Sequence, residues 1–149
     1  KFSPIRIILD NNLETNTNSY IFKTANKINT IIFYNQANKS KILIFKSKKI
    51  KLIKSKIYKN MKFDIKIIMK KLYNLGFRNI LIEGGNALTK NFLNKKIFNQ
   101  FYLFESTQKL SKLVTHKEFD GKSILKKNYK VRIKINSNFG KDAVTLYKN

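Results

Sequence analysis

The sequence predicts an α/β fold: a mixed, mostly parallel sheet flanked by helices, with a C-terminal antiparallel hairpin. Apolar residues at helical spacing in Ile65–Leu72 predict an amphipathic helix. The apolar run Ile80–Ile82 stands directly before a glycine pair, which is typical of a buried strand that turns into a helix. The runs Tyr129–Ile135 and Ala143–Tyr147 flank the turn Asn138–Gly140 and predict an antiparallel pair. The 149 residues are expected to form a single domain, residues 1–149.

The N-terminal third predicts mainly strands and loops. The β-branched run Ile5–Leu9 predicts a strand, and the Asn- and Thr-rich stretch Asn11–Lys27 predicts mostly loop. The short apolar runs Thr30–Tyr34 and Lys41–Phe45 predict two further strands. The lysine-rich stretch Lys46–Lys62 alternates only weakly, which indicates a short strand and a linker.

The clearest helix begins after Asp64, a good N-cap residue, and ends at Gly76, which favours the left-handed conformation of a C-cap. Ile80–Ile82 is apolar at every position, as expected for a central strand that is covered on both faces. Leu88 and Phe92 are four residues apart and predict a second helix over Asn86–Leu93.

The C-terminal part begins with a predicted strand at Phe101–Glu105, and an irregular segment at Ser106–Lys127 follows it. The segment holds the one histidine, His116, which we interpret as a solvated loop residue rather than a catalytic base, because no pair of further ligands is near it in the sequence. Glu118 and Asp120 are too few to specify a cation. We therefore expect no metal site.

The composition excludes several classes of function. The chain has 32 Lys+Arg and 8 Asp+Glu, a net charge of +24, and no cysteine, which excludes disulfides and thiolate chemistry. No apolar run approaches the length of a membrane span, so we expect no membrane partner. The charge comes from 29 Lys and only 3 Arg. Because recognition of phosphates and bases tends to use Arg, the charge is better explained by compositional bias than by a specific nucleic-acid site, although a basic nucleic-acid-binding module stays an alternative.

The segment Leu81–Leu88 is the strongest candidate for a functional site. Two adjacent glycines, Gly84 and Gly85, allow the backbone to approach a ligand, and the helix N-terminus behind them attracts phosphate. Glu83 ends the predicted strand and is placed to hydrogen-bond a substrate or to accept a proton. The structural alternative is an ordinary helix start in which Glu83 only offsets the helix dipole.

Four stretches of the chain resemble the reductase domain of the bifunctional riboflavin-biosynthesis deaminase/reductase. Ile80–Leu88, preceded by the helix ending Leu72–Phe77, is similar to the family's glutamate–glycine–glycine motif. Pro4–Asp10 resembles its proline-headed strand, and Asn91–Phe104 together with Gly140–Leu146 resembles its later segments. The resemblance covers nearly the whole chain.

This resemblance implies a dihydrofolate-reductase-like fold that binds NADPH and reduces the ribosyl group of 5-amino-6-(5-phosphoribosylamino)uracil to a ribityl group. It implies a cytoplasmic homodimer whose substrate is a phosphorylated aminopyrimidine. Glu83 matches the family's substrate-binding glutamate. The implied cofactor contacts are Gly84, Gly85, Asn86, Ala87, Leu88, Asn91, Asp10 and Asn11.

The chain also departs from the family pattern. Asn11 and Asn99 stand where the family usually has Ser and Asp, and Ser106–Thr107 replaces its small residue and proline. The family's upstream reductase strand and its zinc-binding deaminase domain have no counterpart in this sequence. The resemblance therefore implies a reductase domain that is incomplete at its N-terminus, and an inactive dimerisation domain of a larger enzyme is a further alternative.

Overall fold

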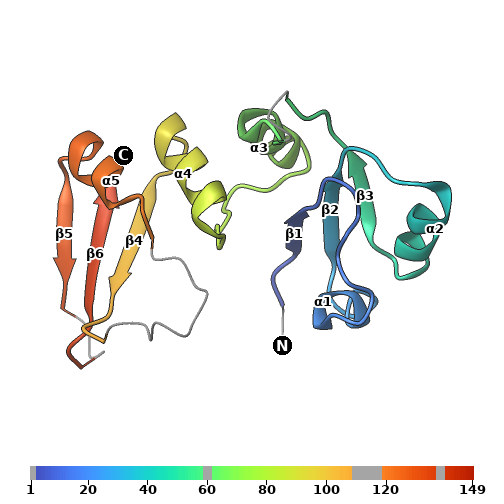
Figure 1. The fold of residues 1–149 in the computed structure, drawn as a ribbon, viewed down its shortest axis with the longest axis horizontal. Helices are drawn as coiled ribbons and strands as arrows, with labels where there is room; N and C mark the ends of the chain where they lie inside the picture. The colour runs from blue at the N-terminus through green and yellow to red at the C-terminus, as the bar shows by residue number, and fades with distance from the viewer. Residues whose placement is uncertain (1–2, 59–61, 109–118, 137–139) are drawn as a thin grey trace. The chain divides into compact units, whose positions relative to one another are not determined.

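The computed structural model describes residues 3–58, 62–108, 119–136 and 140–149 (Figure 1). The chain forms two compact units, Lys1–Phe77 and Arg78–Asn149, which we call the N-terminal unit and the C-terminal unit. Each unit contains a three-stranded sheet with its own helices. We describe each unit by itself.

The sheet of the N-terminal unit is parallel. It consists of β1 (Arg6–Leu9), β2 (Thr30–Tyr34) and β3 (Lys51–Lys54) in the order β1-β2-β3. β1 and β2 confirm the strands predicted at Ile5–Leu9 and Thr30–Tyr34. β3 confirms the short strand predicted within the lysine-rich stretch Lys46–Lys62. Four consecutive residues of β2 are buried, as expected for the central strand of a parallel sheet.

The side chain of Arg6 connects β1 to the segment before β2. Its guanidinium donates hydrogen bonds to the hydroxyls of Thr24, at 2.8 Å, and Thr30, at 2.9 Å. It also donates to the backbone carbonyls of Ile21 and Ile28. Arg6, which belongs to the proline-headed strand, therefore has a structural role in this unit.

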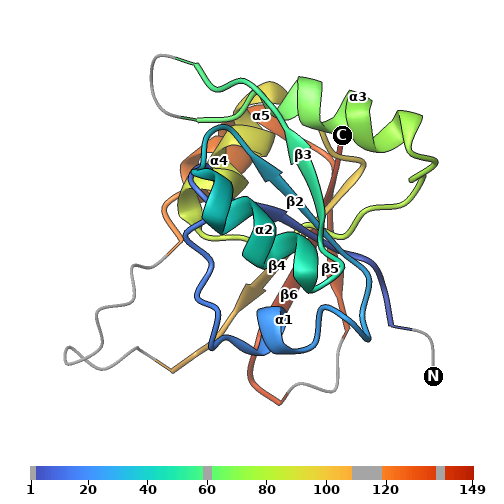
Figure 2. The same cartoon turned by 90° about the vertical axis from the view of Figure 1, so that its right-hand side faces the viewer.

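Two helices and the apolar side of the sheet form the main core of the N-terminal unit. The first, α1 (Tyr20–Lys23), lies within the stretch that the sequence predicts as mostly loop; it is one turn long, too short for an apolar period to reveal. The second, α2 (Lys39–Ser47), stands in front of the strands in Figure 2. The buried residues of this core are Leu13, Phe22, Ala25, Ile32, Phe45 and Ile50.

The predicted strand at Lys41–Phe45 is wrong, because these residues belong to α2. The side chain of Asn38 caps the helix by accepting a hydrogen bond from the Lys41 amide at 2.8 Å. Phe45 is buried in the core, whereas Leu43 is 67% exposed. The apolar run therefore has residues on both the core face and the solvent face of a helix. Because the run is continuously apolar, the sequence does not show which of its residues face the core.

The amphipathic helix is confirmed as α3 (Ile65–Asn74). Asp64 is its N-cap and accepts a hydrogen bond from the Lys66 amide at 2.9 Å. Its buried residues, Ile65, Ile68 and Leu72, follow the predicted spacing. Gly76 has φ = +94°, the left-handed conformation for which glycine is preferred.

The sheet of the C-terminal unit is antiparallel and has the order β4-β6-β5. Its strands are β4 (Gln100–Glu105), β5 (Arg132–Ile135) and β6 (Ala143–Lys148). The predicted hairpin of the last two strands is confirmed, and two residues of its turn, Asn138 and Phe139, lie outside the described residues. β5 begins three residues later than predicted, because Tyr129 is the C-cap residue of the preceding helix and pairing with β6 starts at Arg132. The side chain of Tyr129 is buried and donates its hydroxyl to the Leu93 carbonyl at 2.6 Å.

Two helices complete the C-terminal unit. The predicted helix after the glycine pair is confirmed as α4 (Asn86–Lys95), whereas α5 (Lys122–Asn128) falls largely within the segment predicted to be irregular. Only Leu125 of α5 is fully buried, so this short helix has no apolar stripe for the sequence to reveal. His116 and Glu118 of that segment lie outside the described residues. One core cluster of this unit consists of Leu93, Leu103, Leu125, Tyr129 and Tyr147.

The predicted central strand at Ile80–Ile82 is wrong. The structure assigns no strand between α3 and α4, and neither sheet includes this segment. The Leu81 side chain is 84% exposed. A strand is stabilised by hydrogen bonds to a neighbouring strand, and three apolar residues without such a neighbour do not form one.

The predicted α/β class is confirmed, with both parallel and antiparallel strands and flanking helices. The two kinds of pairing occur in separate sheets, whereas the sequence predicted one mixed sheet. A mixed sheet needs a strand with a parallel neighbour on one side and an antiparallel neighbour on the other. Among the described residues no strand has both, so the strands form two sheets. None of the helices in the described ranges has the length and apolarity needed to span a bilayer.

Candidate functional site

The glycine turn places the N-terminus of α4 in an open position. Gly85 is the N-cap residue and contributes no side-chain hydrogen bond to the first turn. The first N–H groups of a helix have no partner within the helix, and the first turn of α4 contains no acidic residue. This end of the helix is therefore electrostatically suited to a phosphate group.

The two glycines of the turn have different roles. A Cβ atom at Gly84 would lie 2.8 Å from Cδ2 and 3.2 Å from Cβ of Leu88, so a side chain there would push against the helix that follows. A Cβ atom at Gly85 would meet nothing within 4 Å. Gly84 thus allows the turn to pack on α4, whereas Gly85 leaves open space in front of the helix N-terminus.

The other site residues predicted in this region follow the same turn and helix. Glu83 is exposed directly before the glycine pair. Asn86 and Leu88 are half-buried in the first turn of α4, and Ala87 is exposed between them. Asn91, one turn later, is half-buried. The structure therefore brings this part of the predicted site together along one turn and the start of one helix.

Asp10 organises the loop that follows β1. One carboxylate oxygen accepts a hydrogen bond from the Glu14 amide at 2.8 Å, and the other accepts from the amide and the hydroxyl of Thr15, at 2.7 and 2.6 Å. Burial alone would raise the pKa of Asp10, but the hydrogen bonds from the Thr15 hydroxyl and from the loop amides outweigh it and lower the pKa from the usual 3.8. Both carboxylate oxygens therefore have partners within the loop.

This arrangement predicts a pH-dependent contribution to stability. Because the pKa of Asp10 is lower in the folded state, the unfolded chain binds the proton more readily, and stability falls as the pH drops from the unfolded pKa through the folded one. We expect Asp10→Asn to be less stable than the wild type at pH 7, and the difference to shrink below about pH 4. Urea unfolding between pH 3 and pH 7 measures it, and a difference that does not change with pH would contradict this role.

Asn11 joins the ends of two neighbouring strands. Its backbone carbonyl accepts hydrogen bonds from the amides of Asn35 and Gln36, at 2.9 and 3.1 Å. The loop after β1 is thereby attached to the loop after β2. Asp10 and Asn11 belong to the N-terminal unit, whereas the other predicted site residues belong to the C-terminal unit.

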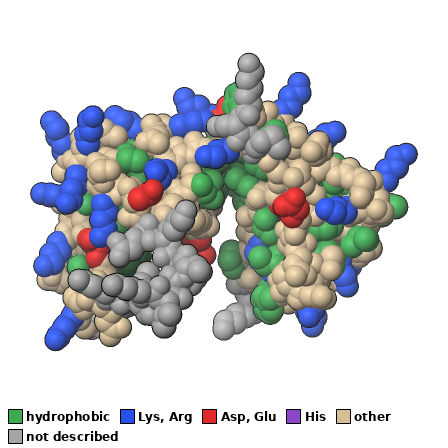
Figure 3. All heavy atoms as spheres, in the orientation of Figure 1, with side chains coloured by type: hydrophobic (Ala, Val, Ile, Leu, Met, Phe, Trp, Pro, Cys, Tyr) green, Lys and Arg blue, Asp and Glu red, His purple; other side chains and the backbone are tan. Residues whose placement is uncertain are grey.

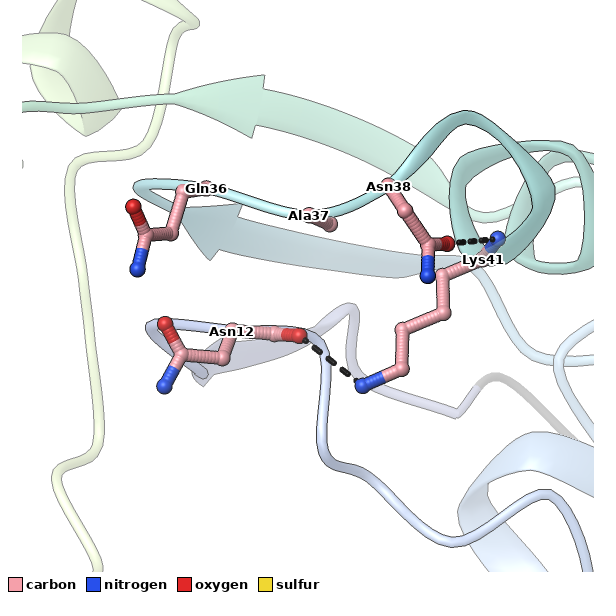
Figure 4. Close-up of a pocket in the computed structure, with 5 residues that line it drawn as sticks. All are labelled: Asn12, Gln36, Ala37, Asn38 and Lys41. Carbon is pink, nitrogen blue, oxygen red and sulfur yellow. Dashed lines mark hydrogen bonds between the residues drawn. The ribbon is translucent and has the colours of Figure 1, made fainter.

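A hollow of about 400 Å³ lies beside these two loops and was not predicted from the sequence (Figure 4). It is lined by Asn12, by Gln36, Ala37 and Asn38, and by Lys41 of α2. Lys41 extends from the helix to the loop after β1 and donates to the Asn12 carbonyl at 3.4 Å. This hollow was missed because Lys41–Phe45 was predicted to be a strand. The signal that could have indicated a helix there is Asn38, a good N-cap residue three positions before Lys41.

Lysine and arginine side chains are spread over the face of each unit that Figure 3 shows. In the part of the chain that the structure describes, no three His, Cys, Asp or Glu side chains lie close enough together to hold a metal ion.

Comparison with known proteins identifies the family. The model of the RibD C-terminal domain family matches residues 1–142 of the chain. The chain belongs to this family. The match extends over both compact units of this RibD C-terminal domain.

Two curated relatives carry the same name, riboflavin biosynthesis protein RibD. The relative from Aquifex aeolicus is 27% identical over 145 residues, which are 97% of this chain and 38% of that protein. The relative from Actinobacillus pleuropneumoniae is 23% identical over 146 residues, 97% of this chain and 39% of that protein. This RibD C-terminal domain therefore spans about two fifths of the length of the relatives it matches.

A solved structure shows the same fold. A pyrimidine reductase-like protein from Corynebacterium diphtheriae matches with a TM-score of 0.70 and 18% identity. The match covers 97% of this RibD C-terminal domain and 60% of the other chain. At this identity the likeness supports the α/β fold class and carries no assignment of substrate.

Proposed function

We propose that this RibD C-terminal domain is an NADPH-dependent reductase of riboflavin biosynthesis. It would reduce the ribosyl group of 5-amino-6-(5-phosphoribosylamino)uracil to a ribityl group. The observation that carries this proposal is the turn Glu83–Gly85 at the N-terminus of α4, whose N-cap residue is a glycine without a side-chain cap, in a chain of the RibD C-terminal domain family. The names of the curated relatives support the pathway.

The residues of the glycine turn fit a phosphate-bearing cofactor. The first turn of α4 has no side-chain cap and no carboxylate, and the space in front of Gly85 is open. In this proposal the backbone at Gly84, Gly85, Asn86 and Ala87 binds a cofactor phosphate, because its N–H groups and the helix dipole favour an anion. Leu88 and Asn91 extend the contact along the helix.

Glu83 binds the substrate in this proposal. A carboxylate accepts hydrogen bonds from the hydroxyl and amino groups that an aminopyrimidine ribose phosphate presents. NADPH, when bound, supplies the hydride for the sugar carbon attached to the amino nitrogen. The role of the protein is then to hold that carbon in a fixed orientation, since positioning contributes much of the catalysis of a bimolecular reaction.

The proposal includes three properties of the whole molecule. Both compact units belong to one reductase domain, because a single family model runs through them. The protein is cytoplasmic, and two copies associate as a homodimer. Light scattering after size exclusion measures the association, with twice the 17.6 kDa of the chain as the expected mass.

The decisive experiment is an assay of NADPH oxidation. The protein assayed contains this chain together with the segment that precedes it in the curated relatives. We expect the absorbance of the reduced nicotinamide to fall only when the aminopyrimidine ribose phosphate is present, and to fall more slowly with NADH. If a folded protein oxidises neither cofactor, the proposal is wrong, and the alternative of an inactive dimerisation domain is favoured.

A further inference from the structure

Thr89 of α4 holds both carbonyl groups of the glycine pair. Its hydroxyl donates a hydrogen bond to the Gly84 carbonyl at 3.3 Å, and its amide donates to the Gly85 carbonyl at 3.2 Å. The neighbouring Leu88 adds a packing contact, because a Cβ atom at Gly84 would lie 2.8 Å from its Cδ2. The first turn of α4 is thus attached to the glycine turn through the side chains of two consecutive residues.

The two glycines have little restraint of their own. Glycine has no side chain, and its backbone loses more conformational freedom on ordering than that of any other residue. Gly85 is the N-cap residue without a side-chain cap, and a Cβ atom there would meet nothing within 4 Å. The orientation of this turn therefore depends on contacts from α4, and the hydrogen bond from the Thr89 hydroxyl is one of them.

The hydrogen bond at Gly84 also sets the direction of the Gly85 N–H. The Gly84 carbonyl and the Gly85 N–H belong to the same peptide unit, which is planar and trans, so the two groups point in opposite directions. Because the carbonyl points toward the Thr89 hydroxyl, the Gly85 N–H points away from it. A rotation of this peptide unit would turn the donor to another direction and would break the hydrogen bond to Thr89.

We propose that Thr89 is a positioning residue of the glycine turn. Its hydroxyl holds the Gly84 carbonyl and thereby keeps the Gly85 N–H directed at an anion that binds there. The inference rests on the proposed function, in which this backbone binds a cofactor phosphate. Thr89 touches no ligand and acts through Gly84. A donor that is already oriented needs no ordering when the ligand binds, and this lowers the cost of binding.

The test compares Thr89→Val with Thr89→Ser in the 149-residue chain. Valine keeps the branched shape of threonine and a similar helix propensity but has no hydroxyl, whereas serine keeps the hydroxyl. The first readout is the amide resonance of Gly85 in chain labelled with ¹⁵N-glycine, which contains five glycines. We expect this resonance to shift in Thr89→Val without any ligand and to stay close to the wild-type position in Thr89→Ser.

The second readout is the affinity for inorganic pyrophosphate, which serves as the probe for the diphosphate of a dinucleotide. We expect Thr89→Val to weaken this binding about three- to tenfold, the effect of losing one neutral hydrogen bond. Thr89→Ser should stay within about twofold of the wild type. Urea unfolding curves verify that each variant is folded.

Ser47→Ala is the matched control, because it removes a similar hydrogen bond at a distant place in the sequence. The exposed Ser47 hydroxyl donates to the Ile44 carbonyl at 2.8 Å within α2 of the N-terminal unit. Its affinity for pyrophosphate should equal that of the wild type. The inference is overturned if the wild type does not bind pyrophosphate, if Thr89→Val binds it as tightly as the wild type, or if Thr89→Ser or Ser47→Ala weakens binding as much as Thr89→Val.

The assay of NADPH oxidation separates this inference from the proposed function. There, Thr89→Val should raise KM for NADPH by a similar factor and leave kcat within about twofold, because the hydroxyl touches no reacting atom. Weaker pyrophosphate binding in Thr89→Val, in a protein that never oxidises NADPH, would contradict the proposed function and leave Thr89 as a positioning residue. Oxidation of NADPH with an unchanged KM in Thr89→Val would retain the proposed function and exclude the role of Thr89.

Discussion

Replacing Glu83 with glutamine is expected to lower kcat/KM of the proposed reduction about ten- to a hundredfold. A hydrogen bond to a charged group contributes about 1.5–3 kcal/mol, and each 1.4 kcal/mol corresponds to a factor of ten in rate. Glutamine keeps the size of the side chain but removes its charge and one acceptor. Because Glu83 is exposed, the substitution should leave the free energy of unfolding nearly unchanged.

The measurement is the initial rate of NADPH oxidation at several substrate concentrations, together with a urea unfolding curve. Glu105→Gln is a matched control, because Glu105 is ion-paired with Lys122 on the surface of the C-terminal unit. It should retain the wild-type kcat/KM. Full activity in Glu83→Gln would show that this carboxylate only offsets the dipole of α4, as in the structural alternative.

Replacing Leu93 with alanine is expected to lower the free energy of unfolding by about 3 kcal/mol. Leu93 has no exposed surface and belongs to the core of the C-terminal unit, together with Leu103 and Leu125. Alanine there removes apolar contacts and leaves a cavity, and the backbone carbonyl of Leu93 is held by the Tyr129 hydroxyl, which limits the collapse of the site. Chemical unfolding followed by circular dichroism measures the loss.

Leu81→Ala is the matched control for that variant. Leu81 is 84% exposed, so its truncation should change the free energy of unfolding by less than about 0.5 kcal/mol. If Leu81→Ala destabilised the chain as much as Leu93→Ala, Ile80–Ile82 would have to be buried after all. The pair of variants therefore tests the C-terminal core and the unpaired segment in one experiment.

Elements with a complete local signal could be predicted from the sequence. The helix α3 has an N-cap at Asp64, an apolar stripe and a glycine at its end, and each of these signals acts within the helix itself. The turn at Gly84 and Gly85 and the start of α4 were predicted for the same reason. Most of the predicted site therefore depends on residues that are close together in the sequence.

Elements whose conformation depends on distant partners could not be predicted. Lys41–Phe45 and Ile80–Ile82 are both short apolar runs, and their hydrophobicity is compatible with a strand or a helix. The first became part of α2 because Asn38 caps it and Phe45 reaches the core. The second has no neighbouring strand and forms neither element.

The sequence by itself determined the α/β class, the family resemblance and the glycine turn that carries the proposed function. These features depend on local spacing and on residue types that are read directly along the chain. Only the tertiary structure decided the hollow beside Lys41. Asn12 and Lys41 are 29 residues apart and meet because parallel pairing of β1 with β2 places the two following loops at the same end of the sheet.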